Sequence, residues 1–257
     1  MNYYLMSVSY DGLNFFGFCK QNNTKLRTVE FEIIKAIKKI FKNNFFKIKG
    51  LSRTDRGVHA LDQKIFLESV IEIKSLKSFF STLNQILNPD IVINNLKKLK
   101  SRNEFFNYKQ KLYCYNLMNI KYKNAFNNRY YYFLDFKFSF QNKLKLQKIA
   151  NLMVGTHNFY HFITITNPIQ KKIVRNIRKI KIKRKKSCYI INIYAVSFLH
   201  HQIRFLVGAI LACFFKKTSV LELKQLLNEP LQKSLLKKQK RFFLVPGKGL
   251  ILKKIFY

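Results

Sequence analysis

The sequence predicts an α+β protein made of two similar units that share one body. Both halves of the 257-residue chain mix segments of helical periodicity with segments of alternating apolar residues, and no Gly-rich or Ser-rich linker separates them. A chain of this length can bury either one large core or two small ones. We place the join near residue 105, which gives an N-terminal half of residues 1–105 and a C-terminal half of residues 106–257.

The first half predicts strands interleaved with helices. Its clearest helix spans residues 28–42, where Val29, Ile33 and Ile37 recur at helical spacing. The acidic residues of this segment come early and its lysines come late, as the helix dipole prefers. Alternation, capping and stop residues predict the other elements of this half, which are a strand at 3–10, a loop at 50–60, a strand at 63–73, a helix from the Ser75 cap to about 87, and a strand at 91–100.

The second half repeats this arrangement. Residues 198–215 predict a strongly apolar helix, and Ser219 with Glu222 predicts a capping box at the start of the next helix. The other expected elements of this half are strands at 112–120 and 129–138, a helix at 143–154, strands at 174–184 and 189–198, and a closing strand at 249–257.

The composition indicates a polyanionic partner. Lys and Arg number 49 against 12 Asp and Glu, which gives a formal net charge of +37. Such a charge repels itself, and it makes physical sense mainly beside nucleic acid. The chain is also crowded with Lys, Asn, Ile and Phe, residues with A/T-rich codons, so mutational drift is a second explanation for part of the charge. The basic stripe at residues 171–186 fits both explanations equally.

Other classes of protein are disfavoured. The four cysteines are scattered and form no CxxC pair, which disfavours a zinc site and a disulfide framework. The N-terminus lacks the pattern of a signal peptide, and the longest apolar run, at residues 205–215, is too short to span a bilayer. We therefore expect a cytoplasmic protein without a membrane partner.

The most informative stretch is LSRTDRGVHA, residues 51–60, which sets Asp55 between Arg53 and Arg56. Nearby guanidinium groups favour the ionised form of a carboxyl group. An ionised carboxylate on a loop can serve as a nucleophile or as an electrostatic stabiliser, and Gly57 permits a sharp backbone path. A structural alternative stays open at this point, in which Asp55 caps a turn and pairs with a neighbouring arginine.

The nonapeptide SRTDRGVHA resembles the active-site signature of the tRNA pseudouridine synthase A family, which usually reads GRTDxGVHA. Further blocks resemble that family in the same order over nearly the whole chain. They are Tyr10-Asp11-Gly12, Phe16-Gly17, Thr28-Val29-Glu30, Pro89-Asp90-Ile91, Tyr113-Cys114-Tyr115, residues 155–159 with Phe162, Arg175-Asn176-Ile177, residues 198–204 with Gly208, and Pro246 with residues 249–252.

The resemblance implies an isomerase that converts uridine to pseudouridine in the anticodon stem-loop of tRNAs, around positions 38–40, with Asp55 as the nucleophile. Whether Asp55 attacks C1′ of the sugar or C6 of the base stays open. The reaction needs no cofactor and no metal, and the chain indeed has no P-loop and no dinucleotide fingerprint. The family's fold implies two ferredoxin-like halves whose sheets join, helices on one side, a basic cleft and a homodimer.

The resemblance also implies roles for individual side chains. Arg204 would be the basic partner of Asp55, and Tyr113 would stack on the target uracil and assist removal of the C5 proton. Arg53 would contact the RNA backbone or fill the space left by the everted nucleotide, and Arg56 and Arg175 complete the expected RNA-binding set. His59 and the pair His200-His201 are expected to be structural or to contact RNA.

The chain departs from the family pattern in places, and two rival functions stay open. Asn158 stands where the family has Asp, Gln202 where it has Met, and the segment from Phe105 to Tyr113 is shorter, without the arginine expected there. The first rival is a noncatalytic RNA-binding or tRNA-folding protein that retains the synthase fold. The second is a pseudouridine synthase that acts on ribosomal RNA. A third, an aspartate-based hydrolase, is disfavoured because no second catalytic carboxylate accompanies Asp55.

Overall fold

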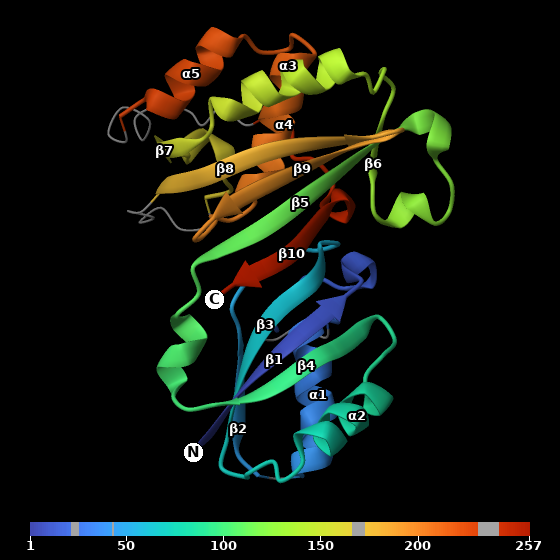
Figure 1. Ribbon diagram of the computed structural model, residues 1–257, viewed down its shortest axis with the longest axis vertical. Helices are drawn as coiled ribbons and strands as arrows, with labels where there is room; N and C mark the ends of the chain where they lie inside the picture. The colour runs from blue at the N-terminus through green and yellow to red at the C-terminus, as the bar shows by residue number, and fades with distance from the viewer. Residues whose placement is uncertain (22–25, 43, 166–172, 231–241) are drawn as a thin grey trace. The chain divides into compact units, whose positions relative to one another are not determined.

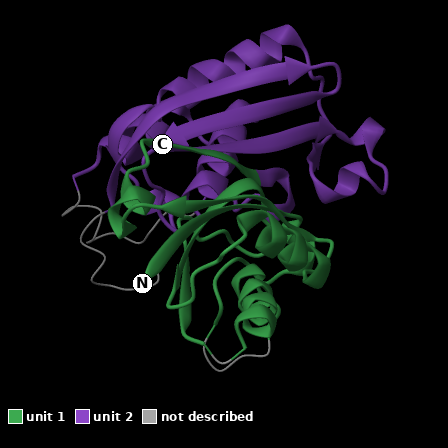
Figure 2. Cartoon of the chain, turned by 60° about the horizontal axis from the view of Figure 1, so that its bottom comes forward, with its two compact units in different colours: residues 1–109, 251–257 green, residues 110–250 purple. Residues whose placement is uncertain are grey.

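The computed structural model describes residues 1–21, 26–42, 44–165, 173–230 and 242–257 (Figure 1). The chain divides into two compact units, coloured separately in Figure 2. Unit 1 comprises Met1–Lys109 and Ile251–Tyr257, and unit 2 comprises Gln110–Leu250. Each unit mixes strands with helices, so the predicted α+β class is confirmed. The predicted division 1–105 and 106–257 places the closing strand in the C-terminal half, whereas residues 251–257 belong to unit 1. Ile251 and Leu252 pair in parallel with His59 and Ala60 of that unit.

The sheet of unit 1 has the strand order β4-β1-β3-β10, and the short strand β2 pairs with β3 as well. β1 lies between two antiparallel neighbours, and its residues Tyr4, Met6 and Val8, which share one face of the sheet, are fully buried. The strands are β1 (Asn2–Tyr10), β2 (Phe46–Gly50), β3 (His59–Ser69), β4 (Ile91–Leu99) and β10 (Leu250–Phe256).

Two capped helices pack on this sheet. The Thr28 hydroxyl accepts the Phe31 N–H at the start of α1 (Val29–Phe41), and the Ser75 hydroxyl accepts the Ser78 N–H at the start of α2 (Leu76–Ile86). The two helices meet where the rings of Phe41 and Phe79 lie 5.3 Å apart. A second apolar cluster contains Leu5, Phe66, Leu99 and Phe105, the last of which lies on the 3-10 helix η2 (Arg102–Phe106).

The sheet of unit 2 has the strand order β5-β9-β8-β7, all antiparallel, while β6 adds to β5 in parallel. Along β8 the buried Ile177, Ile180 and Ile182 pack toward α3 and exposed basic residues occupy other positions. The elements are β5 (Gln110–Asn119), β6 (Tyr132–Leu134), α3 (Phe140–Asn151), β7 (Gly155–Asn158), β8 (Val174–Lys185), β9 (Cys188–Ala195), α4 (Gln202–Phe214) and α5 (Val220–Asn228).

Most predicted elements are confirmed, and two differ. The strand expected at 129–138 is only the three-residue β6, and a 3-10 helix, η4 (Asn127–Arg129), stands at its start. The helix expected from residue 198 begins at Gln202, because His201 adopts a left-handed conformation with φ of 60°. The short strands β2 and β7 were not predicted. Lys171 and Lys172 of the basic stripe lie outside the described residues.

No helix in the described part of the chain combines the length and the apolar character needed to cross a membrane.

The cap of α2 offers a test of this fold. Ser75→Ala removes the hydroxyl that accepts the Ser78 N–H, so we expect the free energy of unfolding to fall by about 1 kcal/mol. Urea denaturation measures the change. The matched control is Ser78→Ala, which removes an exposed serine from the same helix and keeps the backbone N–H. Equal effects of the two substitutions would contradict the cap.

Candidate active site

Asp55 lies in unit 1 on the loop of residues 51–58, which connects β2 to β3. The fully buried Gln63 of β3 secures the start of this loop, because its side chain accepts the Ser52 N–H at 3.1 Å and donates to the Ser52 carbonyl. A buried amide that lost these bonds would leave polar groups unsatisfied in the core. The loop therefore leaves the sheet in a defined direction.

Thr54, the residue before Asp55, is held on two sides. Its hydroxyl lies 2.7 Å from the Tyr10 hydroxyl, and its carbonyl accepts the Phe18 N–H at 3.0 Å. Both Thr54 and Tyr10 are buried, where a satisfied hydrogen bond resists separation because no water replaces it. We call this pair of contacts the Thr54 clamp. It determines where the next residue, Asp55, begins.

A tight turn follows the clamp. The Val58 N–H donates to the Asp55 carbonyl at 3.1 Å, and Gly57 at the third position has φ of 74°. These are the features of a type II turn, which favours glycine at its third residue. Asp55, the first residue of this turn, is half-buried.

Two glycines let the segment after β1 approach this loop closely. A Cβ atom on Gly12 would lie 1.9 Å from the Val58 carbonyl oxygen, and one on Gly17 would lie 2.9 Å from the Thr54 carbonyl oxygen. Gly17 also has φ of 96°, which other residues rarely adopt. The Asp55 loop is thus held at its start by hydrogen bonds from Gln63 and further along by contacts with residues 10–18.

His59 belongs to the support of the loop. Its Nδ1 lies 3.1 Å from both the Gly12 N–H donor and the Asp11 carboxylate. One ring nitrogen cannot accept from the first and donate to the second. The Gly12 N–H has a fixed hydrogen, so we assign Nδ1 as its acceptor. His59 is 3 % exposed, which agrees with the structural role expected for it.

The two arginines beside Asp55 extend over the surface of unit 1. The Arg56 guanidinium lies 4.3 Å from the centre of the Phe16 ring, a cation–π contact. The Arg53 Nε lies 3.2 Å from the Cys19 Sγ. Burial raises the pKa of the Cys19 thiol more than its contact with Arg53 lowers it, so the thiol stays protonated at neutral pH. Both guanidinium groups are exposed, as contact with a polyanion requires.

Tyr113 and Arg204 lie in unit 2. Tyr113, on β5, is buried, and its ring packs edge-on against Phe198 with the centroids 5.3 Å apart. Arg204, in the first turn of α4, is half-buried, and its Nε donates to the Val245 carbonyl at 2.8 Å. Burial raises the pKa of Tyr115 well above its usual value, and the positive charge of Arg204 opposes this rise. Tyr113 and Tyr115 are two positions apart on β5, so their side chains share one face of the strand. The electrostatic effect of Arg204 on Tyr115 therefore acts at the face that also carries Tyr113.

The start of α4 is built from polar contacts. The Thr164 hydroxyl lies 2.8 Å from Nδ1 of His201, and the Gln202 side chain accepts the Leu199 N–H at 2.8 Å. His200 and His201 stack with their centroids 3.8 Å apart. A Cβ atom on Gly208 would lie 1.9 Å from the Phe243 carbonyl oxygen, so α4 packs directly against the irregular segment that carries Val245. Together these contacts orient Arg204.

Arg175, the last residue of the expected RNA-binding set, lies on β8 of unit 2. It pairs with His157 of β7 and is separated from β5 by β9. Two strand spacings amount to roughly 10 Å, so Arg175 stands apart from Tyr113 within this unit. Burial lowers its pKa from the usual range, but a guanidinium remains charged at neutral pH.

Comparison with known proteins decides the family. A family model described as tRNA pseudouridine synthase matches residues 6–103 and 149–257. The chain is 34% identical to tRNA pseudouridine synthase A of Spiroplasma kunkelii over 258 residues, which covers 100% of this chain and 95% of that protein. It is 35% identical to tRNA pseudouridine synthase A of Phytoplasma mali (strain AT), over 99% of this chain and 98% of that protein.

The chain belongs to the tRNA pseudouridine synthase family.

A solved structure, a Cbf5-Nop10-Gar1 complex, matches 79% of this chain and 52% of its own with 11% identity and a TM-score of 0.32, a likeness too weak to support an argument. Within unit 1, the Asp55 loop contacts two other segments that resemble the family. The two N-terminal blocks, Tyr10-Asp11-Gly12 and Phe16-Gly17, are the segments that pack on the Asp55 loop.

One residue of interest was not predicted from the sequence of this synthase. Lys111 lies two positions before Tyr113 on the same face of β5 and is 7 % exposed. Burial lowers its pKa to about 8, since an ammonium group loses solvation there. A lysine near the start of an apolar strand usually faces solvent, so no sequence pattern distinguishes this one.

The close approach of Gly12 to the Asp55 loop is testable. Gly12→Ala places a methyl group 1.9 Å from the Val58 carbonyl oxygen, so the backbone must shift. We expect the free energy of unfolding to fall by about 1–3 kcal/mol, measured by urea denaturation. The neighbouring Leu13→Ala, which truncates an exposed side chain, is the control. A Gly12→Ala protein as stable as this control would contradict the described packing.

The buried lysine predicts a specific pH dependence. Between pH 8 and about 10, the unfolded chain keeps the Lys111 proton that the folded chain releases, so the free energy of unfolding rises with pH. Lys111→Met lacks this contribution. We expect the difference in unfolding free energy between the native protein and this variant to increase by about 2 kcal/mol across that window.

The matched control for this pH series is Lys109→Met, which removes an exposed lysine close by in the chain. Its unfolding free energy should run parallel to that of the native protein. If the Lys111→Met series ran parallel as well, the lowered pKa of Lys111 would be wrong.

Proposed function

We propose that this protein isomerises uridine to pseudouridine in the anticodon stem-loop of tRNAs, around positions 38–40. The N1–C1′ bond of the uridine breaks, the uracil turns while it stays bound, and C5 bonds to C1′. C5 loses one proton and N1 gains one, so the product is an isomer and no co-substrate is consumed. The observation that carries this proposal is the Asp55 loop, which has the family signature and is held in place by the Thr54 clamp.

Asp55 is proposed as the nucleophile. Its half-buried position supports this role, because the carboxylate is partly shielded from water and still accessible. Attack on C1′ of the sugar and attack on C6 of the base are both compatible with a carboxylate nucleophile. In a duplex the reactive atoms are stacked and enclosed, so the target nucleotide must leave its stack before the reaction.

Tyr113 and Arg204 are proposed to serve the same reaction. The Tyr113 ring, supported edge-on by Phe198, offers a stacking surface for uracil, and its hydroxyl can take part in the removal of the C5 proton. The Arg204 guanidinium is oriented by the Val245 carbonyl, and its positive charge would balance the negative charge of the Asp55 carboxylate. Both roles come from the family's signature blocks at these positions.

Arg53, Arg56 and Arg175 are proposed to contact the RNA backbone. The exposure of Arg53 and Arg56 supports this role, and so does the net charge of +37, since phosphate contacts dominate the affinity of proteins for RNA. We further propose that the enzyme works as a homodimer in the cytoplasm, with one tRNA spanning both subunits.

A second candidate function is a noncatalytic RNA-binding or tRNA-folding protein that keeps the synthase fold. The high positive charge favours it, because charge alone suffices for nonspecific binding of RNA. This candidate requires binding only, so it predicts that the Asp55 carboxylate is dispensable.

Asp55→Asn separates the two functions. The amide occupies nearly the same volume but is a poor nucleophile, so we expect pseudouridine formation in unmodified tRNA to fall at least about a thousandfold. Tritium release from C5-labelled uridine, or position-resolved detection, measures the rate. The control is Glu72→Gln, which removes one negative charge from an exposed pair with Lys98.

If the protein is an enzyme, Asp55→Asn should lose pseudouridine formation and still bind tRNA as tightly as the native protein does. If native protein bound tRNA and formed no pseudouridine, the noncatalytic function would stand. Mapping of modified positions in cells that lack the protein distinguishes the tRNA target from ribosomal RNA, since only the true target loses pseudouridine.

A further inference from the structure

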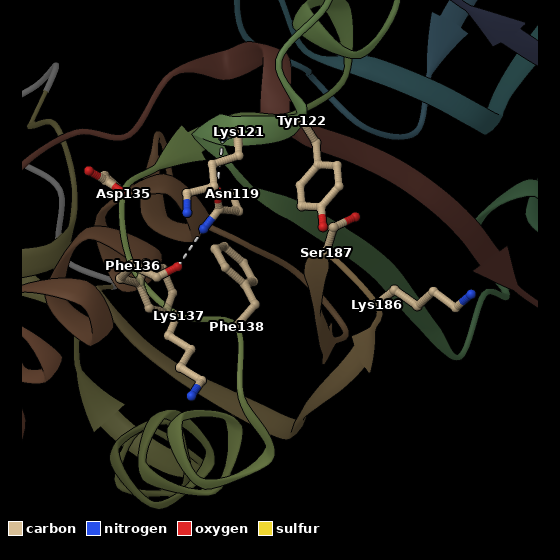
Figure 3. A pocket seen from close by; sticks show the side chains of 9 residues that line it. All are labelled: Asn119, Lys121, Tyr122, Asp135, Phe136, Lys137, Phe138, Lys186 and Ser187. Carbon is tan, nitrogen blue, oxygen red and sulfur yellow. Dashed lines mark hydrogen bonds between the residues drawn. The ribbon is translucent and has the colours of Figure 1, made fainter.

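A pocket of about 490 Å³ opens in unit 2 beyond the end of β5 (Figure 3). It lies between the 3-10 helix η3 (Ile120–Tyr122), the segment of residues 135–138 and the turn that joins β8 to β9. Asn119, on its wall, is six residues after Tyr113 on the same strand, a separation of roughly 20 Å. The pocket is thus distinct from the candidate catalytic residues of this unit.

The floor of the pocket is a built structure. Phe136 and Phe138 stack with their centroids 4.3 Å apart, and Phe138 packs further against the buried Tyr189. The Asn119 side chain donates to the Phe136 carbonyl at 2.7 Å and accepts the Lys121 N–H at 2.9 Å. A single amide thus ties the floor to η3.

The rim combines an exposed ring with positive charge. Tyr122 is 56 % exposed, and Figure 3 shows its ring extending from η3 toward Ser187. Lys121, Lys137 and Lys186 line the same pocket against one carboxylate, Asp135, which leaves a net charge of +2. All three lysines are exposed, so their ammonium groups are free to move toward a ligand.

These features match the chemistry of a nucleotide. The volume lies within the range of small-molecule sites, an exposed aromatic ring offers a stacking surface to any base, and ammonium groups bind phosphate. An acidic peptide would use the lysines but would have no need of the Tyr122 ring. The combination of ring and charge therefore favours RNA over a protein partner.

We propose that this pocket is a second RNA-binding site, which takes one unpaired nucleotide with its base against Tyr122 and its phosphate at Lys121, Lys137 and Lys186. The inference rests on the proposed function in one respect, namely that RNA is the substrate. It adds a contact to a part of the tRNA other than the uridine that reacts.

Binding of unmodified tRNA to the full chain, followed by fluorescence anisotropy, tests the proposal. We expect Tyr122→Ala to weaken the Kd about tenfold and Tyr122→Phe, which keeps the ring, to leave the Kd within about twofold of the native value. Lys137→Gln should lower the slope of log affinity against log salt by about 0.7–0.9. The matched controls are Phe31→Ala on α1 and Lys224→Gln on α5, both exposed and far from the pocket in the sequence.

The changed side chains are exposed, and equal thermal midpoints confirm that each variant is folded. A Tyr122→Ala Kd equal to that of Phe31→Ala overturns the pocket, whatever the enzyme activity. A tenfold loss with Tyr122→Ala supports it even if the native protein forms no pseudouridine, and that second result would overturn only the proposed reaction.

Discussion

The Thr54 clamp is the contact that fixes the position of the Asp55 loop in unit 1. Tyr10 comes from the first strand and Thr54 from the loop before the third, and their hydroxyls meet in a buried setting 2.7 Å apart. The Phe18 N–H completes the clamp from the other side, and the glycine positions 12 and 17 remove the side chains that would keep the two segments apart. A loop held in this way needs no secondary structure of its own. It presents a half-buried aspartate from a rigid base, which is the arrangement that a nucleophile requires.

Charge shapes the rest of the molecule. The stretch from Gln110 to Leu250 contains only three carboxylates, Asp135, Glu222 and Glu229, among many lysines and arginines. The Glu229 carboxylate has a structural contact, since it lies 3.0 Å from Nε2 of His161. Three carboxylates cannot neutralise the lysines and arginines of this stretch. The excess positive charge must therefore be balanced by counterions or by a polyanion. Burial of Lys111 shows that the chain carries positive charge inward as well, at a cost in solvation.

The sequence predicted a large part of this structure and less of the site's support. Helical spacing and caps locate α1 and α2 well, because Thr28 and Ser75 act through local hydrogen bonds that a sequence pattern contains. The motif located Asp55 and the glycine turn for the same reason. The bonds of Gln63 to Ser52 and of Tyr10 to Thr54 join residues 11 and 44 positions apart, and no local pattern encodes them. The same limit explains the shortened strand at 129–138, where the Asn119 side chain bonds the Phe136 carbonyl, and it explains why Lys111 was missed.

The central claim is that the position of the Asp55 carboxylate, set by the clamp and the turn, makes the chemistry possible. Asp55→Glu tests it most directly, because it keeps the charge and moves the carboxylate by one methylene group. Single-turnover formation of pseudouridine in unmodified tRNA is the measurement, with the Kd for tRNA determined in parallel. The account predicts a rate lower by about a hundredfold or more at an unchanged Kd, since a displacement of roughly 1 Å is that costly in a preorganised site. A rate close to that of the native protein would contradict it.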